Sequence, residues 1–203
     1  MSRKPGRKPV FTEQDVIEAA FAIGINQFTL SQVAERLGVA AAALYRLFES
    51  RDAIVHACVR HAVTNTTGPE HGLGWRELLY SLADTYWRLC EDYPGLDKVM
   101  INDPAAVSHF ADFFQRWSEP LLAAGKTTAQ AMFACDMIGY VTMMAHANFR
   151  MYRRERPGTG SPAGEPEQFA SPMQVLANRG MFETQINFIL NALEREWPGA
   201  VSS

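Results

Sequence analysis

The stretch from Leu30 to Phe48, LSQVAERLGVAAAALYRLF, constrains the fold of this chain more than any other. Its apolar residues fall at helical spacing in two runs, and Gly38 stands between the runs. Glycine readily adopts the left-handed conformation that ends one helix and turns the chain sharply into the next. Ala34, four residues before Gly38, is small enough to let a second helix cross closely. The stretch therefore predicts a helix-turn-helix, two short helices joined by a tight turn.

The flanking residues of the same stretch indicate which side faces outward. Thr29 can cap the first helix, and Gln32 three residues later completes a capping box. The second helix is expected to bury Val39, Leu44 and Leu47, so its other side must face solvent. An Ala-rich helix end can approach a DNA groove closely, while tyrosine and arginine reach phosphates or base edges. The predicted DNA-contacting face therefore consists of Ala40, Ala41, Ala42, Tyr45 and Arg46. An isolated glycine-linked pair is more often an ordinary helical hairpin within a core, which is the alternative interpretation.

The wider segment FTLSQVAERLGVAAAALYRLFESRDAIV resembles the DNA-binding segment of the TetR family of bacterial repressors. The resemblance covers roughly residues 11 to 60 and rests on four short motifs. These are Phe28-Thr29, Ala34 to Gly38-Val39, Leu44-Tyr45 through Phe48, and Ser50-Arg51. Thr29 is included among the predicted DNA-binding residues, and Arg51, at the start of the next helix, is placed for a phosphate contact. The family usually has Ser or Thr just after the turn valine, but this chain has Ala40 to Ala43, which removes a cap and a phosphate contact.

The N-terminal segment MSRKPGRKPV is basic and cannot fold alone. It carries Arg3, Lys4, Arg7 and Lys8 without any acidic residue. Such a segment is either a solvated tail or, because it precedes a helix-turn-helix, an arm that follows the phosphates or enters the minor groove. We predict the arm.

Charge is distributed unevenly along the 203 residues. Residues 1–60 hold eight Lys or Arg and six Asp or Glu, a balance of +2, which leaves −5 for the remainder of a chain whose net charge is −3. A mildly basic N-terminal part joined to an acidic one is typical of a DNA-binding domain linked to a domain with another function. Three widely separated cysteines in apolar contexts predict reduced core thiols, and the absence of a signal peptide or transmembrane span predicts a cytoplasmic protein without membrane contact.

Helical patterns continue along the whole chain, so we predict an all-α fold. Thr12 caps a helix to Ile25, and Ser50 caps a helix to about Ala62. The turn-rich residues 65–74 then separate a three-helix head and its linking helix from a helical body. Body helices are predicted over Trp75–Tyr93, Leu96–Ile101, Pro104 to about Leu122, Thr127 or Thr128 to about Arg154, and Met173–Trp197, with a surface loop over Pro157–Pro172. The predicted domains are an arm (1–10), a DNA-binding head (11–64) and a ligand-binding and dimerisation body (74–203).

The body is rich in methionine and aromatic residues. Each of these residues is more often part of a core, but together they suit an adaptable apolar cavity. The candidate ligand-binding residues are Trp87, Met100, Phe110, Phe113, Trp117, Met137, Tyr140 and Met144. The long fourth body helix is apolar nearly all round and is therefore expected to be buried on several sides. Four polar groups within this helix, Asp136, Thr142, His146 and Asn148, each need a partner, a water or a ligand. A ligand pocket in the body is also what the resemblance implies.

The last predicted helix carries an apolar stripe at 3/4 spacing that can pair with a partner helix. We expect Phe182, Ile186, Ile189 and Leu193 to lie in a homodimer interface, and the resemblance also implies a dimer formed through the two C-terminal helices.

The sequence contains no complete motif for catalysis, phosphate binding or metal ligation. Gly125-Lys126-Thr127 lacks the upstream glycine of a P-loop, and the histidines have no metal-ligand spacing. We therefore predict no catalytic residues, no metal, no cofactor and no enzyme activity. The predicted function is a homodimeric transcriptional repressor that binds a palindromic double-stranded DNA operator and is released by a small apolar or amphipathic ligand. The alternative is an all-α small-molecule-binding protein or enzyme whose head has lost specific DNA binding.

Overall fold

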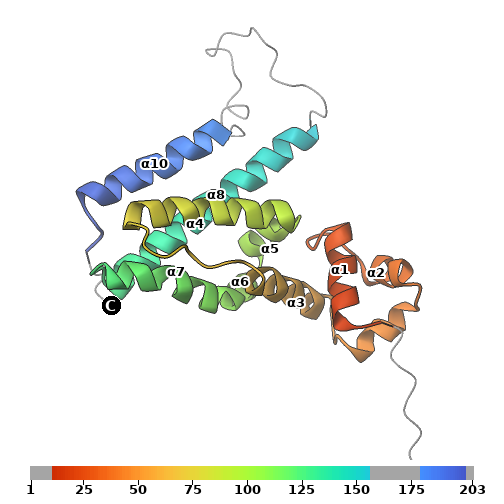
Figure 1. Cartoon of the computed structure of the whole chain (residues 1–203). Coiled ribbons are helices and arrows are strands. Elements are labelled where there is room, and N and C mark those ends of the chain that lie inside the picture. Colours follow the sequence, from red (N-terminus) through yellow and green to blue (C-terminus); the bar gives the residue numbers. More distant parts are fainter. Residues whose placement is uncertain (1–10, 156–178, 200–203) are drawn as a thin grey trace, which may run out of the picture.

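The computed structural model describes residues 11–155 and 179–199, with side chains for residues 11–151 and 181–199. Every regular element in these ranges is a helix, which confirms the predicted all-α class. Figure 1 shows the head (residues 11–64) at one end and the body (residues 74–199) at the other, with α3 running between them. The predicted arm (1–10), the predicted surface loop and the start of the last predicted helix lie outside the described residues.

The head contains α1 (Glu13–Ile23), α2 (Leu30–Leu37), the 3-10 helix η1 (Ala41–Arg46) and α3 (Arg51–Thr64). Helix α1 packs against both α2 and α3. The side chains at the centre of this arrangement are fully buried, among them Val16, Ala20, Phe28, Val33 and Leu44. These residues come from four separate segments, so together they fix the orientation of η1 relative to α1.

The predicted caps of the head helices are confirmed. The Thr12 hydroxyl accepts a hydrogen bond from the backbone N–H of Asp15, and the Asp15 carboxylate accepts one from the Thr12 N–H at 2.7 Å. In α3 the Ser50 hydroxyl accepts from the Ala53 N–H at 3.0 Å. These bonds satisfy N–H groups that a helix start otherwise leaves without partners.

The second helix of the predicted pair differs from the expectation. We predicted an α-helix with Val39, Leu44 and Leu47 buried, but the chain forms the short 3-10 helix η1, and only Leu44 of these three is fully buried. Ala40 occupies the N-cap position and makes no side-chain hydrogen bond. An uncapped helix start leaves several backbone N–H groups without an intrahelical partner, which favours the tighter 3-10 hydrogen bonding of a short segment.

The body is organised around α8 (Thr128–Glu155), which packs against the other long helices. These partners are α4 (Trp75–Asp92), α5 (Leu96–Asn102), α7 (Ala111–Ala123) and α10 (Arg179–Arg195). Thr127 and Gln130 form the capping box that starts α8, with hydrogen bonds of 3.0 and 3.2 Å. Helix α8 approaches α4 closely at Gly139, where an added Cβ would lie 2.9 Å from Cζ of Tyr86. This position therefore accepts only glycine without displacement of Tyr86.

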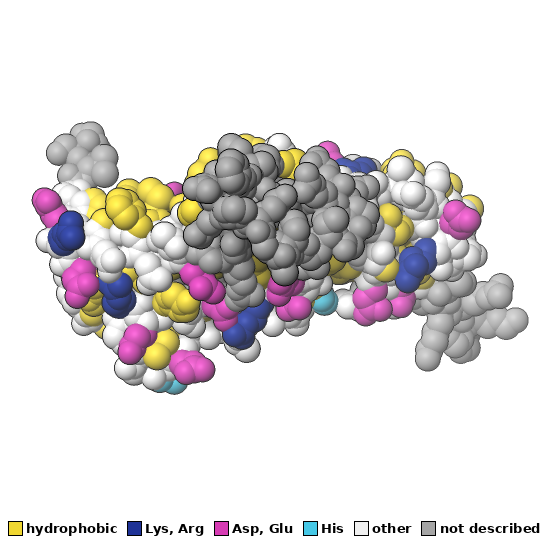
Figure 2. Space-filling model, turned by 90° about the horizontal axis from the view of Figure 1, so that it is seen from above, with side chains coloured by type: hydrophobic (Ala, Val, Ile, Leu, Met, Phe, Trp, Pro, Cys, Tyr) yellow, Lys and Arg dark blue, Asp and Glu magenta, His cyan; other side chains and the backbone are white. Residues whose placement is uncertain are grey.

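Two expectations for the body helices were wrong in detail. The helix expected from Pro104 to Leu122 is divided into α6 (Pro104–Val107), the 3-10 turn η2 (Ser108–Phe110) and α7. At the division, the Ser108 hydroxyl donates to the carbonyl of Ala105, a local bond that competes with regular helical pairing. Helix α8, expected to be buried on several sides, leaves Phe133 and Tyr140 exposed. In the view from above (Figure 2), hydrophobic side chains are visible on the part of the body away from the head.

Candidate DNA-binding and effector sites

The turn between α2 and η1 has the geometry that the sequence predicts. Thr29 and Gln32 form the expected capping box at the start of α2. Gly38 adopts the left-handed conformation, with φ 67°, and its N–H donates to the carbonyls of Ala34 and Glu35. The next N–H, of Val39, donates to the Ala34 carbonyl at 2.9 Å. These bonds close the last turn of α2 and direct the chain into η1.

Ala40 and η1 contain five of the eleven residues predicted to bind DNA. Tyr45 is 57% exposed, and Ala40, Ala42 and Arg46 are also exposed, while Ala41 is half-buried. The Arg46 guanidinium lies over the Phe11 ring, with Cζ 5.8 Å from the ring centre. An aromatic hydroxyl and a guanidinium thus stand together on a surface bounded by methyl groups. Such a surface can enter a DNA groove and reach phosphates or base edges.

Two other predicted contacts have intramolecular roles in the head. The Thr29 hydroxyl belongs to the capping box and lies at the exposed start of α2. Arg51 donates from Nε to the Phe28 carbonyl at 2.9 Å, and its guanidinium stacks 4.7 Å from the Phe28 ring centre. Its Nη1 lies 3.6 Å from a carboxylate oxygen of Asp52. Arg51 therefore ties the start of α3 to the segment before α2. The arm residues Arg3, Lys4, Arg7 and Lys8 lie outside the described residues.

Because Ala40 is an uncapped N-cap, replacing it with serine is expected to stabilise the head. A serine hydroxyl can accept a hydrogen bond from an N–H in the first turn of η1, and such caps typically contribute about 0.5–2 kcal/mol. We expect Ala40→Ser to raise the free energy of unfolding, measured by urea denaturation, toward this range. Ala42→Ser, two residues into η1, is the matched control. A gain that is equal for both variants would contradict the capping role.

The eight predicted ligand-binding residues differ in burial. Phe110, Phe113 and Trp117 are fully buried in a cluster of packed rings, with the Phe113 and Trp117 ring centres 5.9 Å apart. Trp87 is also fully buried and packs against Phe182. Tyr140 is instead exposed. The remaining three, Met100, Met137 and Met144, are half-buried. Large aromatic side chains from α4, α7 and η2 fill the space between these helices. One polar group of this cluster is notable, because Nε1 of Trp117 is buried without a hydrogen-bond partner among the described residues.

Two of the four polar groups of α8 that we expected to need a partner, a water or a ligand have partners within the chain. The Thr142 hydroxyl donates to the carbonyl of Ile138 at 2.7 Å. His146 Nδ1 lies 2.9 Å from a carboxylate oxygen of Asp97 in α5, and both side chains are buried. Asp136 is exposed and Asn148 is half-buried. Thr142 and His146 are thus satisfied within the chain, and neither requires a ligand.

The pair formed by Asp97 and His146 was missed in the sequence, because the two residues are 49 positions apart. Burial by itself would raise the pKa of Asp97. The hydrogen bond from His146, a second one from the Lys98 N–H, and the positive charges of His146 and Arg150 outweigh this effect and lower the pKa below its usual value. Asp97 is therefore a buried carboxylate that depends on its partners for its charge.

The residues predicted to form the dimer interface face the interior of their own chain. Phe182, Ile186 and Leu193 are buried, and the Phe182 ring packs 4.8 Å from that of Trp87 in α4. Ile189 is half-buried. Spacing of 3 and 4 residues correctly indicated an apolar face of α10, and within the chain this face packs on α4 and α8. The outward side of α10 carries Phe188, which is 75% exposed.

The described residues offer little for other chemistry. They contain no group of His, Cys, Asp or Glu that could hold a metal ion. Cys58, Cys90 and Cys135 are buried and unbridged, and burial raises the pKa of the Cys58 and Cys135 thiols to about 12, so they stay protonated at neutral pH. Among the described helices, none is long and apolar enough to cross a membrane.

A three-helix head with an exposed Tyr-Arg face after a glycine turn, carried by a larger helical body, defines a helix-turn-helix DNA-binding protein. Residues 17–58 match the family described as "Bacterial regulatory proteins, tetR family". The head of this chain therefore carries the DNA-binding domain of this family, and the chain has the domain and fold of a DNA-binding transcriptional regulator.

Solved structures extend the likeness to the whole fold. A TetR variant from Acinetobacter baumannii AYE, solved in complex with minocycline, shares 17% identity and a TM-score of 0.71 over 91% of this chain and 97% of that chain. ActR from Streptomyces coelicolor, in complex with actinorhodin, has the same identity and coverage with a TM-score of 0.64. At this identity the likeness concerns the fold. No curated protein matches the sequence significantly.

Proposed function

We propose that this chain acts as a homodimeric repressor that binds a palindromic operator and is released by a small apolar or amphipathic ligand. In this proposal residues 11–64 bind DNA together with the arm at residues 1–10, and residues 74–203 bind the ligand and dimerise. The chain has no catalytic role. The observation that carries the proposal is the exposed face of η1, where Tyr45 and Arg46 stand beside the small Ala40 and Ala42.

The dimer in this proposal forms through the outward faces of α8 and α10. Along α8, the side chains of Phe133, Met137, Tyr140 and Met144 follow one another at spacings of three and four residues, and all are exposed or half-buried. Phe188 adds an aromatic ring on the neighbouring α10. An exposed stripe of this kind is typical of a surface that a second subunit covers. A two-fold axis through it would present two heads to half-sites about one helical turn apart on DNA.

The ligand in this proposal binds in the body. The buried Nε1 of Trp117 supports this position, because an acceptor atom on a ligand would satisfy it. The structural neighbours solved with minocycline and actinorhodin also support a ligand-responsive regulator. Release would follow if the ligand binds more tightly to a conformation whose heads no longer fit both half-sites.

Selection of bound sequences from a random duplex library, with the full chain at near-physiological salt, tests this proposal. A palindromic consensus is the expected result. The alternative, a small-molecule-binding protein or enzyme with an inactive head, is favoured by the absence of hydroxyl groups from Ala40 to Ala43. Failure to enrich any sequence, with a folded protein at several salt concentrations, would support this alternative.

Removal of the Tyr45 or Arg46 side chain is expected to weaken operator binding without unfolding the head. Because both side chains are exposed, Tyr45→Ala and Arg46→Ala should each cost about 1–3 kcal/mol of binding free energy. Fluorescence anisotropy with the selected operator measures the loss, and thermal denaturation checks the fold. Arg36→Ala, on the exposed surface of α2, serves as a charge-matched comparison. Unchanged affinity in both variants would exclude this docking face.

A further inference from the structure

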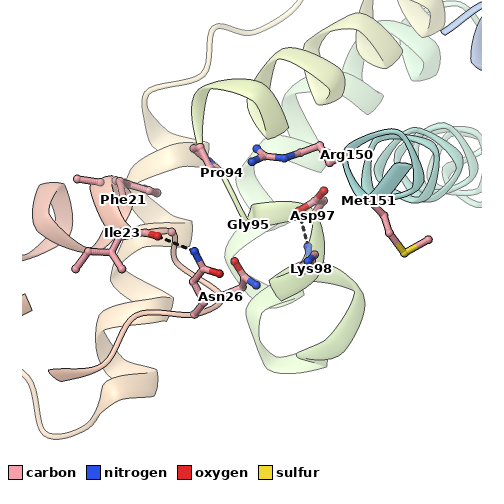
Figure 3. Close-up of a pocket in the computed structure, with 12 residues that line it drawn as sticks. Phe21, Ile23, Asn26, Pro94, Gly95, Asp97, Lys98, Arg150 and Met151 are labelled. Carbon is pink, nitrogen blue, oxygen red and sulfur yellow. Dashed lines mark hydrogen bonds between the residues drawn. The ribbon is translucent and has the colours of Figure 1, made fainter. Parts of the chain in front are cut away.

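A groove of about 590 Å³ lies between the head and the body and is lined by residues of both (Figure 3). Its head wall comes from the end of α1 and the following turn, where Phe21 and Ile23 provide apolar surface. Its body wall comes from the α4–α5 connection and the end of α8, including Pro94, Lys98 and Arg150. A volume of this size suits a small organic molecule.

The base of the groove is a direct contact between head and body. The Ile25 N–H donates to the Pro94 carbonyl at 3.3 Å, and the Phe21 and Tyr93 ring centres lie 4.7 Å apart. Gly95 lies so close to Asn26 that an added Cβ would stand 2.2 Å from its Oδ1. A molecule above this base would contact both walls at once.

The exposed charged side chains of the groove, Lys98 and Arg150, are cationic. Asp97 lines it but is buried, with His146 and the Lys98 N–H as hydrogen-bond partners. The Arg150 guanidinium extends from α8 toward Pro94 in Figure 3. Within the described part of the chain, the side chains of Arg150 and Lys98 have neither a hydrogen bond nor an ion pair. Two cationic donors beside apolar side chains are the recognition elements for an amphipathic anion.

We propose that this groove is a second effector site, which binds an organic anion with an apolar body, such as an aromatic carboxylate or sulfonate. The anionic group contacts Arg150 and Lys98, and the apolar part packs on Phe21, Ile23 and Met151. None of the residues predicted for the body ligand lines this groove, so the two sites are distinct. A ligand that fits one orientation of the head better than another changes the affinity of the head for DNA, and DNA binding changes the affinity for the ligand in return.

The test uses 8-anilinonaphthalene-1-sulfonate as the anionic probe and uncharged N-phenyl-1-naphthylamine as its neutral counterpart. Each probe is titrated into a solution of the full chain, and its binding is followed by its fluorescence. Arg150→Gln and Lys98→Gln should each weaken binding of the sulfonate about tenfold, because each removes a charge-assisted contact, and should change binding of the neutral probe little. Arg88→Gln, which removes an exposed charge from α4, should change neither. Ala22→Trp, which fills the groove from the head side, should weaken binding of both probes.

The proposal is overturned if the Arg150→Gln/Lys98→Gln double variant binds the sulfonate within about twofold of the unmodified chain. It is also overturned if the two probes lose affinity equally in this variant, since the charge would then have no specific role. Circular dichroism of each variant ensures that a loss of binding reflects the groove and not a loss of fold.

Discussion

Replacement of His146 with leucine is expected to destabilise the chain by about 3–5 kcal/mol, because it leaves the Asp97 carboxylate buried without its principal partner. The two side chains are each 2% exposed and lie 2.9 Å apart, so water cannot replace the lost imidazole. Trp87 packs edge-on against the His146 ring, and leucine preserves part of that apolar contact. Urea denaturation at neutral pH measures the loss.

The double variant Asp97→Asn/His146→Leu separates the charge from the packing. Removal of both charged partners of a buried pair is often nearly neutral, and an asparagine oxygen can still accept the Lys98 N–H, so we expect most of the stability to return. If the double variant is no more stable than His146→Leu, the loss comes from the shape of the imidazole and the ion-pair argument is wrong.

The pH dependence gives a second check on the same pair. In the unmodified chain the folded state lowers the pKa of Asp97, so the ionised carboxylate contributes stability above about pH 4, and that contribution is lost as the pH falls through the folded pKa. In His146→Leu, burial instead raises the pKa, and protonation of Asp97 then relieves the penalty. The stability difference between His146→Leu and the double variant should therefore shrink as the pH falls from 7 toward 4. A difference that is constant with pH would contradict this assignment.

The helix starts could be predicted from the sequence because their determinants are local. Thr12 with Asp15, Thr29 with Gln32, and Ser50 with Ala53 each act across three residues, and Gly38 acts on its own backbone. The relevant physics is complete within one turn of helix. This locality explains why the helix-turn-helix and the all-α class followed from the sequence.

The partners of the long helices could not be predicted in the same way. The spacing of Phe182, Ile186 and Leu193 indicates an apolar face, but the same spacing results whether that face packs on α4 or on another subunit. Trp87, which covers Phe182, is 95 positions earlier in the chain. The groove between head and body likewise depends on how Arg150, Pro94 and Phe21 are brought together, which no local pattern specifies.

Introduction of a carboxylate on the outward face of α10 is expected to have the largest effect on DNA binding. The Phe188 ring is 75% exposed in the single chain, and in the proposed dimer it lies at or near the two-fold axis. Phe188→Glu would bury a charge in each subunit of the dimer without a partner, which costs several kcal/mol and opposes association. Because Phe188 makes little contact within its own chain, the fold of the subunit should persist.

We expect Phe188→Glu and, on α8, Tyr140→Glu to be monomers in sedimentation equilibrium at a protein concentration of about 10 µM. Each variant should also lose at least about a hundredfold in affinity for a palindromic operator, because one head alone contacts only one half-site. Binding to an isolated half-site should stay near that of the unmodified chain. Ile101→Glu places the same charge on an exposed apolar residue of α5, away from the stripe, and should remain dimeric. If both stripe variants keep the mass of a dimer, the subunits associate through another surface. If they become monomers yet retain full operator affinity, a single head suffices for recognition and the palindromic operator is excluded.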